Sequence, residues 1–251
     1  MAPHGKREPD CHAMILDWLI LLGLLAAYFW YVRGGGIATG TGRIARYRRW
    51  MRRAPLAFGA TSLAALLASQ QLQALATPPT AFAPAATLAR RLAGFGGNVA
   101  DLQLAVLGGF GGGVLLGMVI AWRRKRRGKR QLVAGDLERI MPRTSGELVW
   151  TAALGIVAGV VEELFFRLAL PLFATLATGD VWIGLTLALA AFAYAHRYQG
   201  RVGMVFSTLA GGLFAILYLA TGSLGFTMLV HALLNLNGLV LRPALIGPAP
   251  R

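Results

Sequence analysis

The stretch ELVWTAALGIVAGVVEELFFRLALPLFATL (147–176) decides the fold class. A helix needs about 20 apolar residues to cross a bilayer, and this run is longer than that. After Glu147 at its start, the run holds only three charged residues, Glu162, Glu163 and Arg167. The sequence therefore predicts a membrane-spanning helix that carries two carboxylates and a guanidinium in its apolar interior.

The composition of the whole chain is typical of a membrane protein. Of its 251 residues, 56% are hydrophobic and 14% are charged, whereas soluble domains carry about 25% charged residues. Because backbone polar groups must be satisfied internally in a bilayer, we expect an all-α, polytopic bundle of transmembrane helices. About seven spans are expected, at Met14–Val32, Pro55–Ala76, Asp101–Trp122, Glu147–Leu176, Val181–Tyr198, Gly203–Thr221 and Ser223–Leu241.

The chain is expected to form one integrated bundle rather than separate domains. Its parts are an N-terminal tail with three spans and their basic loops (1–146), a core (147–241) and a short C-terminal tail (242–251). The first apolar run is followed by no small-residue cleavage site, so we expect a retained anchor. The single cysteine, Cys11, excludes an intramolecular disulfide and a Cys/His zinc cluster.

The positive charge of the chain, +15 in total, is concentrated in two runs. These are RIARYRRWMRR (43–53) and RRKRRGKR (123–130), and each follows an apolar segment. Cytoplasmic loops of membrane proteins are rich in Lys and Arg, which places the N-terminus outside and the C-terminus in the cytoplasm. Nucleic-acid binding is the alternative interpretation, and the position of the runs disfavours it. We expect contact with anionic lipids and no nucleic-acid partner.

One glycine pattern predicts close helix packing. Gly109, Gly113 and Gly117 recur at four-residue spacing, and small residues at this spacing let membrane helices approach each other.

Ionisable residues inside the apolar spans are the strongest functional signal. Each costs about 2.5–3.5 kcal/mol at the centre of a bilayer, so such residues are candidates for function. Glu163 and Arg167 lie four residues apart and can pair on one helix face. Glu162 is rotated from Glu163 by about 100° and is left free. A carboxylate among apolar residues is suited to act as a general base.

Two further motifs place polar groups at overlapping depths. FAYAH (192–196) sets Phe192 and His196 on one face, and HALLN (231–235) does the same for His231 and Asn235. At about 1.5 Å per residue from the outer end of each span, the depths are roughly 21 Å for Glu162, 22 Å for His196, 18 Å for Asn235 and 12 Å for His231. Each motif alone has a structural explanation, as an ion pair or a hydrogen-bonding strut. Their agreement in depth favours a shared site.

The three motifs, in this order on successive helices, resemble the CPBP family of intramembrane endopeptidases, which are CAAX proteases and bacteriocin-processing or Abi proteins. The resemblance covers 147–241 and implies a catalytic core that hydrolyses a peptide bond within the membrane. It implies that Glu162 and His196 activate water and that His231 and Asn235 stabilise the oxyanion. Glu163, Arg167 and Phe192 would support these four.

The resemblance leaves the cofactor open. Glu162, His196 and His231 could hold zinc together with a water, but the helical HExxH pair of zinc peptidases is missing. A glutamate mechanism without metal is therefore favoured, with zinc as the alternative.

Two other functions compete with proteolysis. One is a non-catalytic membrane immunity or scaffold protein of the same family. The other is a transporter that uses Glu162 and the histidines as a proton relay, which the lack of an internal repeat disfavours. The richness in Ala, Gly and Arg indicates a bacterial inner-membrane protein. We expect its substrate to be a membrane-associated peptide or protein.

Overall fold

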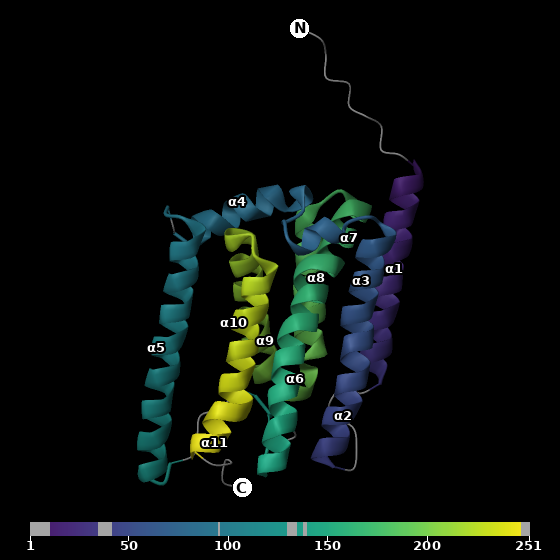
Figure 1. Ribbon diagram of the computed structural model, residues 1–251. Coiled ribbons are helices and arrows are strands. Elements are labelled where there is room, and N and C mark those ends of the chain that lie inside the picture. Colours follow the sequence, from purple (N-terminus) through teal and green to yellow (C-terminus); the bar gives the residue numbers. More distant parts are fainter. Residues whose placement is uncertain (1–10, 35–41, 95, 130–134, 138–139, 247–251) are drawn as a thin grey trace.

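The computed structural model describes residues 11–34, 42–94, 96–129, 135–137 and 140–246, and within them the chain is helical without a strand. Figure 1 shows the helices standing side by side as a bundle, with α4 lying across one end. The expected all-α fold is confirmed. Parts of both tails and of the two basic loops lie outside the described residues (1–10, 35–41, 130–134, 138–139 and 247–251).

The elements follow one another along the chain with several changes of helix type. π-Helical turns (η1, η4 and η6) interrupt three of the long helices, and short 3-10 turns (η2, η3 and η5) join others. In order, the elements are α1 (Cys11–Arg33), α2 (Arg43–Ala54), η1 (Pro55–Ala60), α3 (Thr61–Ala68), η2 (Leu72–Leu75), η3 (Thr80–Phe82), α4 (Ala83–Leu92), α5 (Val99–Arg126), α6 (Ser145–Glu163), η4 (Leu164–Ala169), α7 (Leu170–Thr178), α8 (Val181–Ala195), η5 (Arg197–Gln199), α9 (Gly200–Thr221), α10 (Leu224–Leu236), η6 (Asn237–Leu241) and α11 (Arg242–Ile246).

Five helical stretches in the described residues are long and apolar enough to cross a membrane, against about seven expected. They are His12–Arg33, Val99–Arg126, Ser145–Thr178, Arg197–Thr221 and Leu224–Leu245.

The other two expected spans are not among these five, and both end for local reasons. The one at Pro55 is part of a continuous helix from α2 through η1 to α3, whose first part is rich in arginine, and the one at Val181 is a shorter helix. The helix that includes Pro55 ends at Ala68, and Gln70 then takes a left-handed backbone with φ 57°. The helix from Val181 ends at Ala195, where the His196 N–H bonds to the carbonyl of Ala193. The orientation of the termini stays a prediction.

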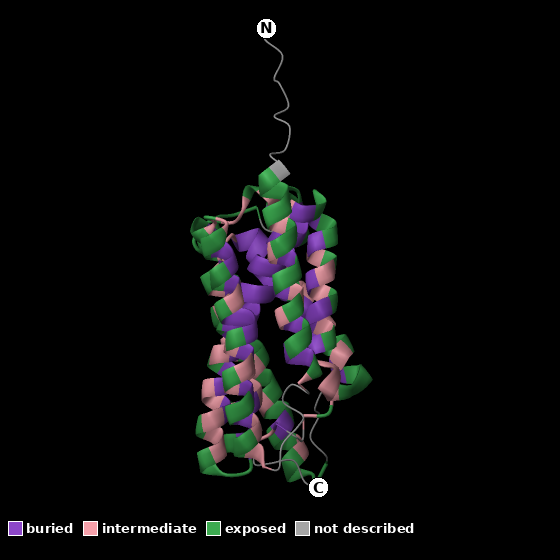
Figure 2. Ribbon diagram, turned by 90° about the vertical axis from the view of Figure 1, so that its right-hand side faces the viewer, coloured by how far each residue is buried: buried purple, intermediate pink, exposed green. Residues whose placement is uncertain are grey.

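The core lies around the stretch from α6 through η4 to α7. Every residue of η4 is buried, and so are most residues of α7. Figure 2 shows this buried material inside the bundle, with exposed residues on its outside. α10 packs along α6, and α1 and α8 pack along α7. The residues singled out in the apolar run therefore occupy the centre of the bundle.

Close approach of α6 and α10 depends on Gly159. A Cβ atom added there would lie 2.7 Å from the backbone nitrogen of Ala232. No side chain fits at that distance, so glycine is required for the contact. Because Ala232 follows His231, this contact sets the depth of His231 against α6.

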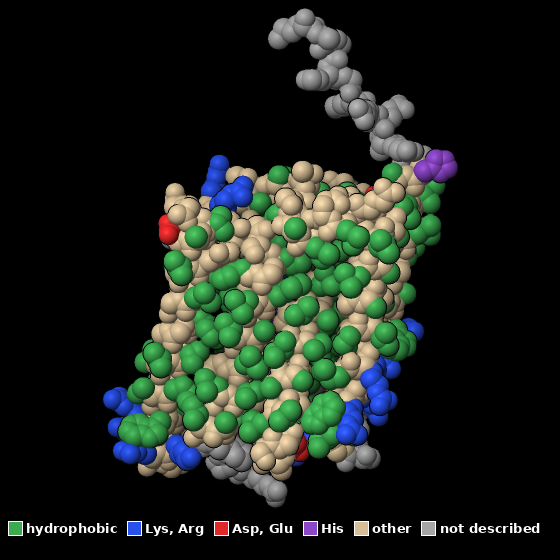
Figure 3. Space-filling view, in the orientation of Figure 1, with side chains coloured by type: hydrophobic (Ala, Val, Ile, Leu, Met, Phe, Trp, Pro, Cys, Tyr) green, Lys and Arg blue, Asp and Glu red, His purple; other side chains and the backbone are tan. Residues whose placement is uncertain are grey.

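Lys and Arg side chains gather at one end of the bundle, beyond an apolar band, as Figure 3 shows for one face. α2 and the C-terminal end of α5 lie at this end, which we call the basic end. The two basic runs thus lie on the same side, as the sequence predicted. A smaller basic group lies at the opposite end near α4, which carries Arg90 and Arg91.

Candidate active site

Glu162 and Glu163 close α6, just before the π-helical turn η4. Such turns are frequent at functional sites. The side chain of Glu163 is fully buried, and Arg167 is 2% exposed. Arg167 Nε lies 3.2 Å from Glu163 Oε2, so the pair predicted from the four-residue spacing is formed.

Two aromatic rings flank the Arg167 guanidinium. Its central carbon lies 4.4 Å from the ring centre of Phe192 and 5.7 Å from that of Phe214. Ring faces attract a desolvated cation. Phe192 thus contacts the buried charge, and its supporting role in the site stays a prediction.

His231 reaches Glu163 from α10. Its Nδ1 lies 2.7 Å from Glu163 Oε1, and its ring stacks on Phe214 with centres 4.6 Å apart. Glu163 is therefore shared between Arg167 and His231. Sequence spacing could not reveal this contact because it joins two helices, and the depth estimate had placed His231 higher in its span.

Glu162 and His196 face each other across a short gap. Glu162 Oε2 lies 4.0 Å from His196 Nε2, which is too far for a direct hydrogen bond and suits a bridging water. The other ring nitrogen, Nδ1, lies 2.8 Å from the carbonyl oxygen of Phe192. Because a carbonyl only accepts, Nδ1 carries the proton and Nε2 of a neutral ring is left as an acceptor.

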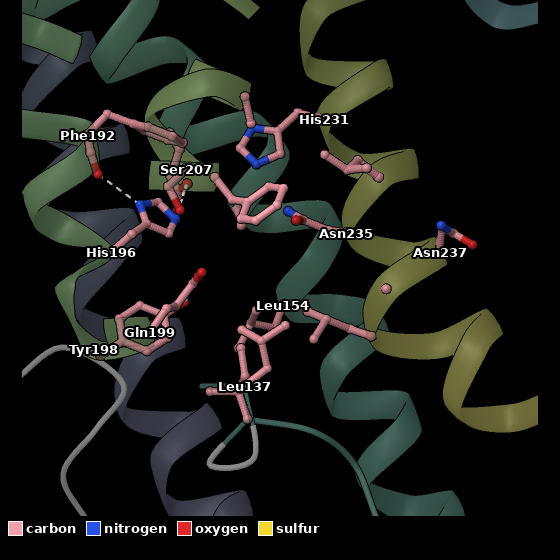
Figure 4. A pocket seen from close by; sticks show the side chains of 18 of the residues that line it. Leu137, Leu154, Phe192, His196, Tyr198, Gln199, Ser207, His231, Asn235 and Asn237 are labelled. Atoms are coloured by element: carbon pink, nitrogen blue, oxygen red, sulfur yellow. Dashed lines mark hydrogen bonds and ion pairs between the residues drawn. The ribbon is translucent and has the colours of Figure 1, made fainter. Parts of the chain in front are cut away.

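These side chains border a cavity of about 370 Å³. Glu162, His196, His231 and Asn235 all line it. Figure 4 shows His231 and Asn235 projecting into it from α10 and His196 from the turn between α8 and η5. Asn235 donates a 3.3 Å hydrogen bond to the carbonyl of Gly155. The four predicted catalytic residues are thus brought to one cavity, while Glu163 and Arg167 lie behind its wall.

The cavity also has polar residues that the sequence analysis missed. Tyr198 and Gln199 line it toward the basic end, and Gln199 Nε2 donates to the Tyr198 hydroxyl at 3.1 Å. Ser207 lines it from α9. On the lipid-facing side the wall includes Phe206, which is 53% exposed. The one available signal was their position in the sequence, two and three residues after His196.

The described residues contain no group of three or more His, Cys, Asp and Glu side chains placed to share a metal ion. The expected zinc ligands were Glu162, His196 and His231. His231 directs Nδ1 to Glu163, and His196 directs Nδ1 to the carbonyl of Phe192. Both contacts leave Nε2 as the nitrogen that could bind a metal, as is usual for zinc-binding histidines. The misfit lies in the grouping, because the three side chains are not placed around one point.

Comparison with known protein families gives a match that covers the candidate site. Residues 144–237 match the model of the Rce1-like family, described as type II CAAX prenyl endopeptidase Rce1-like. Over these residues the chain is similar to this family. The match includes every residue of the candidate site from Glu162 to Asn235, and it confirms the resemblance. Searches of curated proteins and of solved structures give no match. The match supports a CAAX endopeptidase-like protease, and together with the apolar helices it supports an integral membrane protein.

Proposed function

We propose that the protein is an intramembrane endopeptidase that hydrolyses a peptide bond of a membrane-associated peptide or protein. The observation that carries the proposal is the 4.0 Å gap between Glu162 Oε2 and His196 Nε2. It opens on a cavity that Asn235 also lines. Amide hydrolysis needs a base, a water and an oxyanion stabiliser. Glu162 can supply the base and Asn235 the oxyanion stabiliser, and the gap accommodates the water.

In the proposed reaction, a water binds between Glu162 and His196. Glu162 takes one proton as the water oxygen attacks the scissile carbonyl carbon, and the carbonyl oxygen becomes an oxyanion. His196 Nε2 accepts a hydrogen bond from the second hydrogen of the water and so orients the nucleophile. Glu162 then returns its proton to the leaving amine nitrogen as the C–N bond breaks, so that the carboxylate is regenerated.

Asn235 and His231 would bind the oxyanion, and their contributions differ. The Asn235 amide can donate a hydrogen bond to the oxyanion regardless of the protonation of neighbouring groups. His231 directs Nδ1 to the Glu163 carboxylate, so Nε2 of a neutral ring can only accept. His231 donates to the oxyanion only when its ring carries both protons, and the Glu163 carboxylate then balances that charge. Glu163 therefore acts as a positioning residue behind His231.

The alternative within the family is a non-catalytic immunity or scaffold protein. Such a protein would need the buried Glu163–Arg167 pair for folding, but not a free carboxylate at Glu162 facing a histidine. We further propose a bacterial inner-membrane location, with anionic lipids around the basic end.

The test is a comparison of membrane peptides from cells that produce either the wild type or Glu162→Gln. Glutamine keeps the shape of the side chain and removes the base. We expect at least one peptide that only the wild type cuts, and the same peptide from Asp101→Asn, which removes an exposed carboxylate far from the cavity. Cleavage that survives both Glu162→Gln and His196→Ala would show that hydrolysis is not the function.

A further inference from the structure

A second cavity, of about 200 Å³, lies between α5 and the C-terminal end of the chain. On the α5 side its wall includes Gly113, Gly117 and Ala121. On the other side lie Asn237 of η6 and Arg242 of α11. We call this cavity the α5 slot. Its residues are separate from the proposed catalytic four.

The α5 wall of the slot combines a line of small residues with the apolar side chains of Val114, Met118 and Ile120. Gly113, Gly117 and Ala121 follow one another at four-residue spacing, so they form a single stripe on α5. A Cβ atom added at Gly113 or Gly117 would meet no neighbouring atom within 4 Å. Gly109, the third residue of the predicted packing pattern, also has no neighbouring atom at that distance. The close packing that the sequence predicted for these glycines is therefore wrong within the described chain, and Gly113 and Gly117 border open space.

α5 itself stands at the edge of the bundle. It is an apolar helix of 28 residues, and almost none of its apolar stretch is buried. Its main contacts are with α9 and, at the basic end, with α11. In a bilayer the space beside such a helix is filled by hydrocarbon, because water is excluded from it.

The charged residues of the slot lie at one end. Arg124 belongs to the last turn of α5, and Arg242 begins α11. Both line the slot together with the Asn237 amide. Figure 4 shows the Asn237 side chain turned away from His231 and His196. The slot is thus apolar along the membrane and positively charged at the basic end.

An apolar channel with two guanidiniums at its interfacial end matches one class of molecule, an amphiphile with a hydrocarbon chain and an anionic head. We propose that the α5 slot binds an anionic phospholipid. One chain lies against Gly113, Gly117 and Ala121. The phosphate lies between Arg124 and Arg242, since guanidinium groups bind phosphate oxygens in a bidentate manner. Asn237 donates to the same headgroup. The site does not depend on the proposed peptidase activity.

The test is native mass spectrometry of the full chain in detergent, titrated with phosphatidylglycerol or with phosphatidylcholine of the same chains. We expect tighter binding of phosphatidylglycerol. The double variant Arg124→Gln/Arg242→Gln should bind it about 30-fold more weakly, which corresponds to two basic side chains near a membrane surface. Gly113→Leu/Gly117→Leu fills the slot without changing charge and should also abolish tight binding.

A matched control separates this site from general surface charge. Arg48 and Arg52 line another hollow at the basic end, on α2. Arg48→Gln/Arg52→Gln removes the same charge there and should leave tight binding intact. An equal loss in both arginine double variants would overturn the site in favour of diffuse attraction. The proposed site would also be overturned if Gly113→Leu/Gly117→Leu bound phosphatidylglycerol as tightly as the wild type does. Displacement of the lipid by an equal concentration of soluble glycerol 3-phosphate would overturn it as well. Open space at both glycines predicts that this variant folds, which its Tm checks.

Discussion

Arg167→Met offers a sharp test of the buried charge network behind the active site. Arg167 is 2% exposed, and its partner Glu163 is fully buried. Their closest N–O distance is 3.2 Å. Methionine fills similar volume without charge, so the variant leaves Glu163 buried with His231 as its remaining partner at 2.7 Å. Removing one member of a buried pair typically costs about 3–5 kcal/mol.

The size of the effect translates into a thermal shift. For a chain of this length about 1 kcal/mol corresponds to roughly 2–4 °C in Tm, so Arg167→Met should lower the Tm by about 6–20 °C. Adding Glu163→Gln removes the stranded charge, and its amide oxygen can still accept from His231 Nδ1. The double variant Glu163→Gln/Arg167→Met should therefore be more stable than Arg167→Met alone, with a coupling of about 1–3 kcal/mol.

The assay is thermal unfolding of the purified protein in detergent, followed by loss of monodisperse protein. Arg201→Met is the control, because Arg201 is exposed and a surface substitution shifts stability by less than about 0.5 kcal/mol. The reasoning is refuted if Arg167→Met unfolds at the temperature of Arg201→Met. It is also refuted if the double variant is less stable than Arg167→Met, because the two losses would then not arise from one shared charge network.

Three other substitutions or treatments test the site and its frame. Gly159→Leu should lower both the Tm and the activity, because its Cβ would lie 2.7 Å from the Ala232 backbone. The control, Gly212→Leu, places its side chain in open space and should change neither. Equal effects of the two variants would contradict the close packing of α6 on α10. Asn235→Leu should lower kcat by about 10²–10³ with little change in KM, as loss of an oxyanion donor does; a change in KM alone would assign Asn235 to substrate binding. Activity should survive exhaustive chelation, and its loss with recovery on added zinc would replace the glutamate mechanism by a metal-dependent one.

Contacts within one helix were predictable from the sequence, and contacts between helices were not. The four-residue spacing predicted the Glu163–Arg167 pair, and the same spacing set Phe192 beside His196, whose rings lie 4.5 Å apart. The bond from His231 to Glu163 depends on how far α10 slides along α6, which Gly159 and Ala232 determine. No spacing within a single segment contains that information.

Two of the expected spans were not confirmed, because local backbone geometry ended each helix before the expected boundary. Gln70 turns to a positive φ after α3, and α8 stops just before His196. The second of these endings has a consequence for the site. Because His196 follows the helix, its backbone N–H bonds to Ala193 while its ring bonds to the carbonyl of Phe192, and this double attachment directs Nε2 to Glu162. An apolar-length criterion places such an ending only to within a few residues, and the expected spans therefore ran on to Tyr198 and Ala76.

The two adjacent glutamates can be assigned different roles on physical grounds. A rotation of about 100° separates neighbouring residues on a helix, so only one of the two can face α10 and Arg167. Glu163 takes that position, is fully buried, and is held by Arg167 and His231. Such a carboxylate is poorly suited to exchange a proton with water, because both of its oxygens are occupied by charged or hydrogen-bonding groups. Glu162 lines the cavity and has His196 across a gap that suits one water, so the general base must be Glu162 if the protein is a glutamate peptidase. Activity that survived Glu162→Gln and was lost in Glu163→Gln, with the fold intact, would reverse this assignment.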